Sequence, residues 1–281
     1  MTQPVCDLHV LDNHGGLQYP GDLREPAVTA LLLVAAALYG LAVGSFLNVV
    51  IYRVPNKQSV VKPASACPGC GQPIAPRDNI PVVSWLLLRG RCRNCGMGIS
   101  ARYPLVEVLT AAVFVGVALR FGWSWTLPAE IIFVAGLVAL SFIDLDHLLL
   151  PRVIVYPLGA AVLAALVLAA GVQGSWHRLA VAAICAGVEF AVLFLINLIS
   201  PRALGFGDVR LGPVIALALG WLGWRYAFIG FLAANLLGAV VGVALILMKR
   251  AGRRTPIPFG VFLSLGAFVT MMIGGAVHYP A

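Results

Sequence analysis

Two aspartates of this chain lie beside long apolar stretches, where an ionisable group is costly and is expected to be functional. Asp208 occurs in LGFGDVRLG, residues 204–212, and Asp144 occurs in SFIDLDHLLLPR, residues 141–152. Each lies near one end of an expected helix, so both would reach a similar shallow depth in a membrane. Two carboxylates that meet can share one proton, so that one activates a water and the other donates to a carbonyl. The pair therefore predicts the chemistry of an aspartic protease.

Small and charged residues surround these aspartates and are candidates for supporting roles. Gly205 and Gly207 precede Asp208 and carry no side chain that would block an approaching peptide backbone. Asp146 and Arg210 each stand two residues from one of the aspartates and are further supporting candidates. A simpler interpretation stays open, in which Asp208 only caps its helix. In that interpretation Asp144 or Asp146 is an interfacial residue that pairs with Arg152 or Arg210.

Four cysteines in one polar stretch have the spacing of a metal site. They occur in CPGCGQPIAPRDNIPVVSWLLLRGRCRNC as two C-x-x-C pairs, Cys67 with Cys70 and Cys92 with Cys95. About twenty residues separate the pairs, which is close to the spacing of zinc ribbons. A glycine follows each pair and suits the tight turn of a zinc knuckle. Four cysteine ligands leave no open position on zinc, so the pattern predicts a structural rather than a catalytic ion.

The composition identifies the elements that must position these residues. The chain has 281 residues, of which 60% are hydrophobic and 11% charged, and its mean hydropathy is +0.95. A soluble domain averages about 25% charged residues. The apolar runs are long and continuous, unlike the short alternating strands of a membrane barrel. We therefore expect an all-α polytopic membrane protein, and the net charge of +8 does not indicate a nucleic-acid partner.

A helix needs about twenty apolar residues to cross a bilayer, which predicts about eight transmembrane helices. One large polar segment, residues 52–102, separates the first span from the second and contains all four clustered cysteines. We call this segment the insert, and we expect it to be a small cytoplasmic zinc-ribbon-like unit. The expected spans are roughly 27–50, 104–121, 128–148, 153–171, 179–199, 209–223, 226–248 and 257–277.

The distribution of basic residues predicts the orientation of these spans. With the N-terminus outside, the segments that face the cytoplasm contain 15 of the 19 Lys and Arg residues, in agreement with the positive-inside rule. Residues 1–26 contain four acidic residues and do not resemble a cleavable signal peptide. The insert would then lie in the reducing cytoplasm, where disulfides are rare. Both aspartates would lie at the cytoplasmic membrane face.

Taken together, the motifs resemble the type IV prepilin leader peptidases, a family of bifunctional peptidases and N-methyltransferases. The likeness covers nearly everything after residue 40. The matching segments, besides the two cysteine pairs, are GSFLNVVIYRVP at 44–55, ISARYPLVEVLT at 99–110, FIDLDHLLLP at 142–151, the G-x-G-D segment GFGDVRL at 205–211, and IPFGVFL at 257–263.

This resemblance implies an activity. Such enzymes cut the basic leader from type IV prepilins or pseudopilins, then methylate the new N-terminus with S-adenosylmethionine. Carried over by motif, Asp144 and Asp208 would be the catalytic aspartates, and Asp144 is chosen because it stands three residues after Ser141, as in related preflagellin enzymes. Gly90, Arg91 and Glu107 are candidates for methyl transfer because the family segment contains such residues.

The resemblance also implies how the chain is divided and where it acts. Residues 1–26 would be extracytoplasmic, 27–51 the first transmembrane helix, 52–102 the zinc-binding and methyltransferase-associated insert, and 103–281 the membrane peptidase domain. The enzyme would lie in the bacterial cytoplasmic (inner) membrane in contact with lipid. The sequence leaves a homo-oligomer open.

Three positions depart from the family pattern, and other functions stay open. Arg152 follows Leu150-Pro151 where the family usually has aspartate, Arg210 replaces a lysine, and Val261 replaces a proline. None of these positions belongs to the proposed aspartate pair. The alternatives are a peptidase without methylation, a proton- or cation-coupled transporter, and a non-catalytic scaffold of a secretion machine. A zinc-ribbon insert is not expected of a transporter.

Overall fold

The computed structural model describes residues 26–200, 205–249 and 257–274. Within these ranges the regular elements are all helices, and β-pairing is limited to two isolated bridges inside the insert. The predicted all-α class is therefore confirmed. The expected extracytoplasmic segment 1–26 lies, apart from Pro26, outside the described residues.

The long helices coincide with the predicted spans. Six of them are long and apolar enough to cross a membrane, whereas α7 (Phe206–Leu222) and α9 (Phe259–Ile273) are shorter, with 17 and 15 residues. The sixth span begins three residues earlier than predicted, so that Asp208 lies within the helix. The helices that match the predicted spans are α1 (Pro26–Arg53), α3 (Arg102–Phe121), α4 (Leu127–His147), α5 (Arg152–Gln173), α6 (Trp176–Ile199), α7 (Phe206–Leu222), α8 (Trp224–Leu247) and α9 (Phe259–Ile273).

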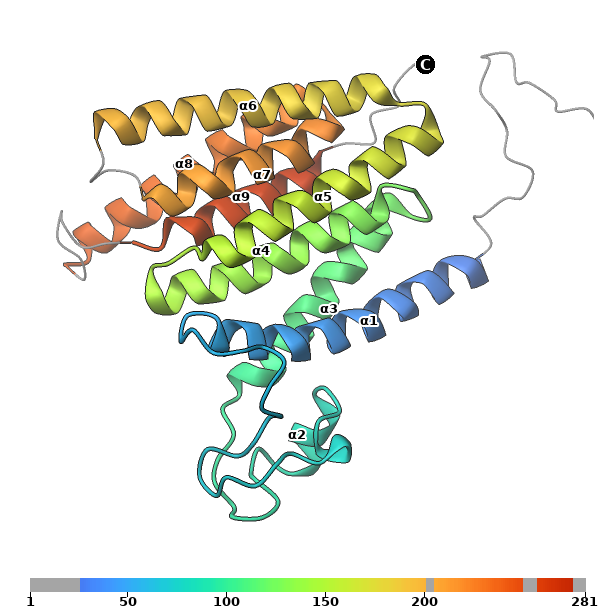
Figure 1. The fold of residues 1–281 in the computed structure, drawn as a ribbon, viewed down its shortest axis with the longest axis vertical. Coiled ribbons are helices and arrows are strands. Elements are labelled where there is room, and N and C mark those ends of the chain that lie inside the picture. Colours follow the sequence, from blue (N-terminus) through green and yellow to red (C-terminus); the bar gives the residue numbers. More distant parts are fainter. Residues whose placement is uncertain (1–25, 201–204, 250–256, 275–281) are drawn as a thin grey trace, which may run out of the picture.

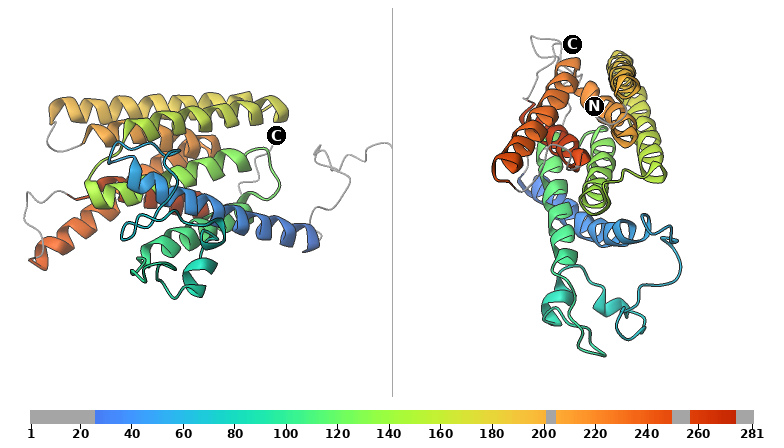
Figure 2. Two further views of the ribbon diagram at one scale, coloured as in Figure 1. Left: turned by 60° about the horizontal axis from the view of Figure 1, so that its bottom comes forward. Right: turned by 90° about the vertical axis from the view of Figure 1, so that its left-hand side faces the viewer.

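The helices pack in pairs, and the insert projects from one of these pairs. α1 packs mainly on α3, α6 on α7, and α8 on α9. Figures 1 and 2 show that the insert extends from the α1–α3 pair, away from α5 to α9. The insert contains only a 3₁₀ turn, η1 (Pro76–Asp78), and the short helix α2 (Val83–Leu87). Such a small fold buries little hydrophobic core. A bound metal would supply the missing stability, as the sequence led us to expect.

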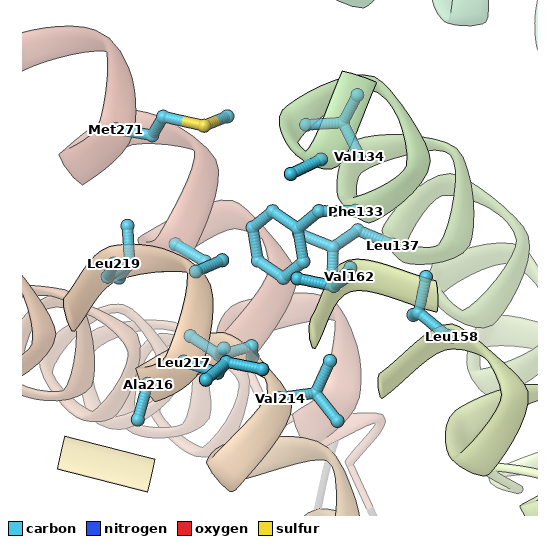
Figure 3. Close-up of a cluster of buried hydrophobic side chains, with 14 of the residues drawn as sticks. Phe133, Val134, Leu137, Leu158, Val162, Val214, Ala216, Leu217, Leu219 and Met271 are labelled. Carbon is cyan, nitrogen blue, oxygen red and sulfur yellow. The ribbon is translucent and has the colours of Figure 1, made fainter. Parts of the chain in front are cut away.

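The core of the membrane part surrounds α7. Side chains of α4, α5 and α9 converge on this helix, as Figure 3 shows for Phe133, Val162 and Met271. Most residues of α7 are buried even though the helix is short. A polar group at the start of such a helix is enclosed by protein rather than by lipid, which makes the carboxyl group of Asp208 tolerable there.

The α1–α3 pair is held by direct backbone contact. A Cβ atom added at Gly40 would lie 2.6 Å from the Cα atom of Ala111, and one added at Gly44 would lie 2.7 Å from the Cα atom of Glu107. Small residues of this kind allow membrane helices to approach closely. The close packing of α1 on α3 fixes the two ends of the insert, which connects these helices.

Candidate active site

The structure brings the two predicted aspartates together. Asp144 lies in the last turn of α4, which ends at His147 before the left-handed residue Leu148. Asp208 is the third residue of α7 and follows the N-cap residue Gly205. Both side chains are buried, with 5% and 8% exposure, and the charge of Asp144 acts on Asp208. Two helix ends thus place two buried carboxylates close enough for their charges to interact, and we call them the carboxylate pair.

The start of α9 covers Asp144. A Cβ atom added at Gly260 would lie 2.9 Å from the Oδ2 atom of Asp144, and the backbone N–H groups of Gly260 and Val261 face this carboxylate. Such N–H groups at a helix N-terminus stabilise a nearby negative charge. Proline, which the family usually has at the position of Val261, carries no N–H group. This chain therefore presents one donor to Asp144 that a proline would lack.

The two glycines before Asp208 have different surroundings. A Cβ atom at Gly205 would lie 3.2 Å from the Oδ2 atom of Asp208, so its absence leaves space beside that carboxylate. A Cβ atom at Gly207 would instead lie 2.9 Å from the Cβ atom of Leu150. Leu150 also lies against Gly260, and it thereby packs between the starts of α7 and α9. Close packing against Leu150 therefore explains why residue 207 is a glycine.

The two charged supporting candidates point elsewhere. Asp146 accepts hydrogen bonds from the guanidinium of Arg102 at 2.8 and 2.5 Å. The guanidinium of Arg210 lies 4.5 Å from the ring centroid of Phe206 and 5.9 Å from that of Tyr156. Asp146 is therefore bound to α3, and Arg210 packs on aromatic rings. The ion pairs expected in the simpler interpretation involved Arg152 or Arg210, whereas the observed partner of Asp146 is Arg102.

The four predicted metal ligands form one cluster. The Sγ atoms of Cys67, Cys70, Cys92 and Cys95 all lie within 4.8 Å of one another, and those of Cys67 and Cys95 are 3.7 Å apart. Tetrahedral zinc with bonds of about 2.3 Å to sulfur requires its ligands to be about 3.8 Å apart. The donor set and its spacing therefore fit a zinc ion.

Each cysteine pair forms the same turn. The N–H group of Gly71 donates to the carbonyl of Cys67 at 2.8 Å, and that of Gly96 donates to the carbonyl of Cys92 at 2.9 Å. The φ angles of these glycines are 70° and 72°, in the left-handed region that favours glycine. The predicted turn at both glycines is confirmed.

The pKa values of the clustered thiols favour a bound cation. Backbone N–H groups of Cys70 and Gly69 lower the pKa of Cys67 to about 6. Although a backbone hydrogen bond at Met97 opposes the change, loss of hydration and the neighbouring thiols raise the pKa of Cys95 to about 11. Clustered thiols therefore cannot all ionise by themselves, and a bound divalent ion would supply the missing positive charge.

A cavity of about 450 Å³ separates the insert from the helix ends beneath it. Its lining includes Asn48 and Arg53 of α1, Tyr103 and Glu107 of α3, and Trp85 and Cys92 of the insert. Among the three methyl-transfer candidates, Glu107 alone lines this cavity. Gly90, with a φ of +64°, lies beneath Trp85, so that an added Cβ atom would be 3.0 Å from the indole ring. Arg91 is exposed to solvent.

Comparison with known proteins decides the family. Residues 38–121 match the bacterial peptidase A24 N-terminal domain, and residues 131–243 match the type IV leader peptidase family. The chain is 36% identical over 271 residues to the prepilin leader peptidase/N-methyltransferase of Aeromonas hydrophila, which covers 85% of this chain and 90% of the relative. The chain belongs to the type IV leader peptidase family. The family and the peptidase class predicted from the motifs are thereby confirmed.

Other members of the leader peptidase family show similar likeness. The chain is 43% identical over 229 residues to the prepilin leader peptidase/N-methyltransferase of Myxococcus xanthus, covering 80% of this chain and 67% of the relative. It is 35% identical over 270 residues to the protein of that name from Pseudomonas aeruginosa, covering 87% and 91%. No solved structure matches the chain.

One neighbour of the carboxylate pair, Gly260, lies in a segment that the sequence marked, although no role was predicted for this glycine. IPFGVFL was recognised as a family segment, and its Gly260 is the residue that lies against Asp144. The cavity between insert and helices had no such signal, because its lining comes from three separate stretches of the chain.

Proposed function

We propose that this leader peptidase cleaves the basic leader of a type IV prepilin or pseudopilin with Asp144 and Asp208, and then N-methylates the new N-terminus. The observation that carries the proposal is the meeting of two buried carboxylates from the ends of α4 and α7. The names of the relatives, prepilin leader peptidase/N-methyltransferase, support both halves of the activity.

The proposed setting is the bacterial inner membrane, with the N-terminus outside and the insert in the cytoplasm. The support is the charge distribution, since 15 of the 19 basic residues fall in the segments assigned to the cytoplasm. In this arrangement residues 1–26 are extracytoplasmic, 27–51 form the first transmembrane helix, 52–102 form the zinc-binding insert, and 103–281 form the peptidase domain. The carboxylate pair lies at the cytoplasmic surface, where the leader of a membrane-inserted prepilin meets its apolar stem.

Cleavage follows from two carboxyl groups that share one proton. The ionised carboxylate accepts a proton from a water, whose oxygen attacks the scissile carbonyl carbon. The protonated partner donates its proton to the carbonyl oxygen. Collapse of this intermediate breaks the C–N bond, and the departing nitrogen takes a proton from the pair. N–H groups at the start of α9 stabilise the negative form of Asp144 during this cycle.

The insert supports methylation of the amine that cleavage releases. Zinc bound by the four cysteines would hold the insert in shape and supply no open coordination position. S-adenosylmethionine would supply a reactive methyl group on a positively charged sulfur atom. The insert packs beside the α1–α3 pair, which also contacts α4. This packing supports a placement of the two proposed activities on one side of the membrane.

The test uses the purified full-length protein, a prepilin and S-adenosylmethionine. Asp144→Asn and Asp208→Asn should each lower leader cleavage by at least about a hundredfold, in the range of lost acid–base catalysis. Asp146→Asn is the matched control and should retain cleavage, because Asp146 is bound to Arg102. An unchanged temperature of thermal unfolding would report that each variant folds. Wild-type cleavage by Asp208→Asn would contradict the assignment, and a cleaved but unmethylated product from the wild type would leave a peptidase without methylation.

A further inference from the structure

The cavity between the insert and the α1–α3 pair has one buried carboxylate without a cationic partner. Four charged side chains line this cavity: Arg53, Asp78, Arg93 and Glu107. Asp78 and Arg93 pair with each other through contacts of 2.6 to 3.1 Å. Arg53 donates to the carbonyls of Ser59 and Pro63 at 2.9 and 2.8 Å. Among the residues that the structure describes, Glu107 forms no ion pair.

Glu107 is held in the wall of the cavity by the backbone of the insert. It is 7% exposed, and its Oε2 atom accepts a hydrogen bond of 2.7 Å from the N–H group of Val82. Val82 has a φ of 61°, a left-handed conformation that is rare for a β-branched residue. A buried carboxylate is costly unless a cation pairs with it. The strained contact and the unpaired charge together favour a cationic ligand at this place.

The rest of the lining describes the kind of ligand. The lining of the cavity combines apolar side chains with many polar ones, and its volume of about 450 Å³ falls in the range of sites for small molecules and cofactors. The ring of Trp85 lines it, and the indole Nε1 donates to the carbonyl of Ile99 at 3.0 Å, which fixes the ring. An aromatic face and a carboxylate both favour an organic cation. A flat aromatic part of the ligand would also pack on such a ring.

We propose that this cavity binds S-adenosylmethionine, with Glu107 as the counter-ion of its positively charged sulfonium or ammonium group. The proposal rests on the proposed N-methyltransferase activity and assigns a site to its methyl donor. The donor fits the lining because it combines an aromatic base with positive charge. Glu107 binds the donor, and Trp85 packs against it. The two zinc knuckles form one wall through Cys67 and Cys92, so that zinc would preserve the shape of the site.

The position of the cavity suits transfer to a freshly cut peptide. Ser100 and Tyr103 line the cavity on either side of Arg102. Arg102 binds Asp146, which stands two residues after Asp144 on α4. One ion pair therefore joins the cavity wall to the helix that carries half of the carboxylate pair.

Direct binding of labelled S-adenosylmethionine to the purified protein, without prepilin, tests the site. The wild type should bind saturably, and Glu107→Gln should weaken binding at least tenfold by removing the charge while keeping the shape. Glu189→Gln is the matched control on α6, which lies on the opposite side of the helices from α1 (Figure 1) and should bind as the wild type does. Val49→Phe should also weaken binding, since Val49 lines the cavity and the larger ring would fill it.

Leader cleavage and zinc content separate a lost site from a lost fold. Both should stay at wild-type levels in Glu107→Gln and Val49→Phe, because neither residue belongs to the carboxylate pair or the cysteine cluster. If Glu107→Gln does not fold, Val49→Phe carries the test. Unchanged binding in the folded variants would overturn the site, whereas a wild type that binds the donor but neither cleaves nor methylates prepilin would overturn the proposed function. Competition by a peptide with a free N-terminal phenylalanine would place the acceptor in the cavity and also overturn the proposal.

Discussion

Asp146 accepts two hydrogen bonds from Arg102, so the second aspartate of FIDLD is bound to α3 rather than directed at Asp208. The guanidinium also lies 5.2 Å from the ring centroid of Phe142, one turn earlier on α4. Two neighbouring acids on one helix thus have separate tasks. Asp144 faces the starts of α7 and α9, and Asp146 ties the end of α4 to the start of α3.

We expect the pair of Arg102 and Asp146 to contribute modestly to stability. Both side chains are about a third exposed, so solvent screens the attraction. Arg102→Ala should therefore lower the free energy of unfolding by about 1 kcal/mol or less. A double-mutant cycle with Asp146→Asn should give a small favourable coupling in thermal unfolding. If the changes in the free energy of unfolding were strictly additive, the contact would contribute nothing to stability.

The contact between Gly260 and Asp144 predicts a selective loss of cleavage. In Gly260→Ala the new methyl group would lie 2.9 Å from the Oδ2 atom of Asp144 and from the Cδ2 atom of Leu150. The carboxylate would have to turn away, and we expect cleavage to fall at least tenfold, because catalytic groups must hold their geometry closely. Donor binding and zinc content should not change.

Gly242→Ala is the matched control for this change. It also adds a methyl group to a glycine of a late helix, but its nearest neighbour would be the Cδ1 atom of Ile257 at 3.4 Å, an ordinary contact with the end of a flexible side chain. Cleavage by this variant should equal that of the wild type. Equal activity of Gly260→Ala and Gly242→Ala would contradict the importance of close packing at Asp144.

Removal of zinc should affect the insert and the donor site more than the peptidase. Cys67→Ser with Cys92→Ser should abolish zinc binding, measured as metal content per chain, since a structural site needs its full ligand set. Binding of S-adenosylmethionine should fall with the metal because both cysteines line the cavity. Cys185→Ser on α6 is the control and should retain zinc. Full metal content in the double variant would contradict the four-cysteine site.

The positions of the spans could be predicted because hydropathy alone marks a membrane helix. The faces of those helices could not. Membrane helices are apolar all round, so no hydrophobic stripe tells which side meets protein and which meets lipid. The sequence therefore predicted that Asp144 and Asp208 share a depth, whereas the contact of Gly260 with Asp144 depends on how α9 packs on α4. Arg210 was expected to support the aspartates, and only packing shows that it faces Phe206 and Tyr156.

The cysteine pattern was more informative than the charged residues because a metal imposes its own geometry. Four thiolates must surround one zinc, so spacing along the chain predicts a cluster in space. No comparable spacing rule predicts the residues that line the cavity. Asn48, Trp85 and Glu107 come from α1, the insert and α3, and their meeting is a result of the tertiary fold.

A pair of glycines in the insert tests the turn that each zinc knuckle requires. Gly71 and Gly98 both have open space where a Cβ atom would be, but only Gly71 has a positive φ, of 70°. Gly71→Ala should therefore destabilise the zinc-bound insert by about 1–2 kcal/mol, the cost of a left-handed residue with a side chain. Gly98→Ala should change it little. Competition with a chelator would measure both, and equal zinc retention in the two variants would show that the knuckle tolerates a side chain at the turn.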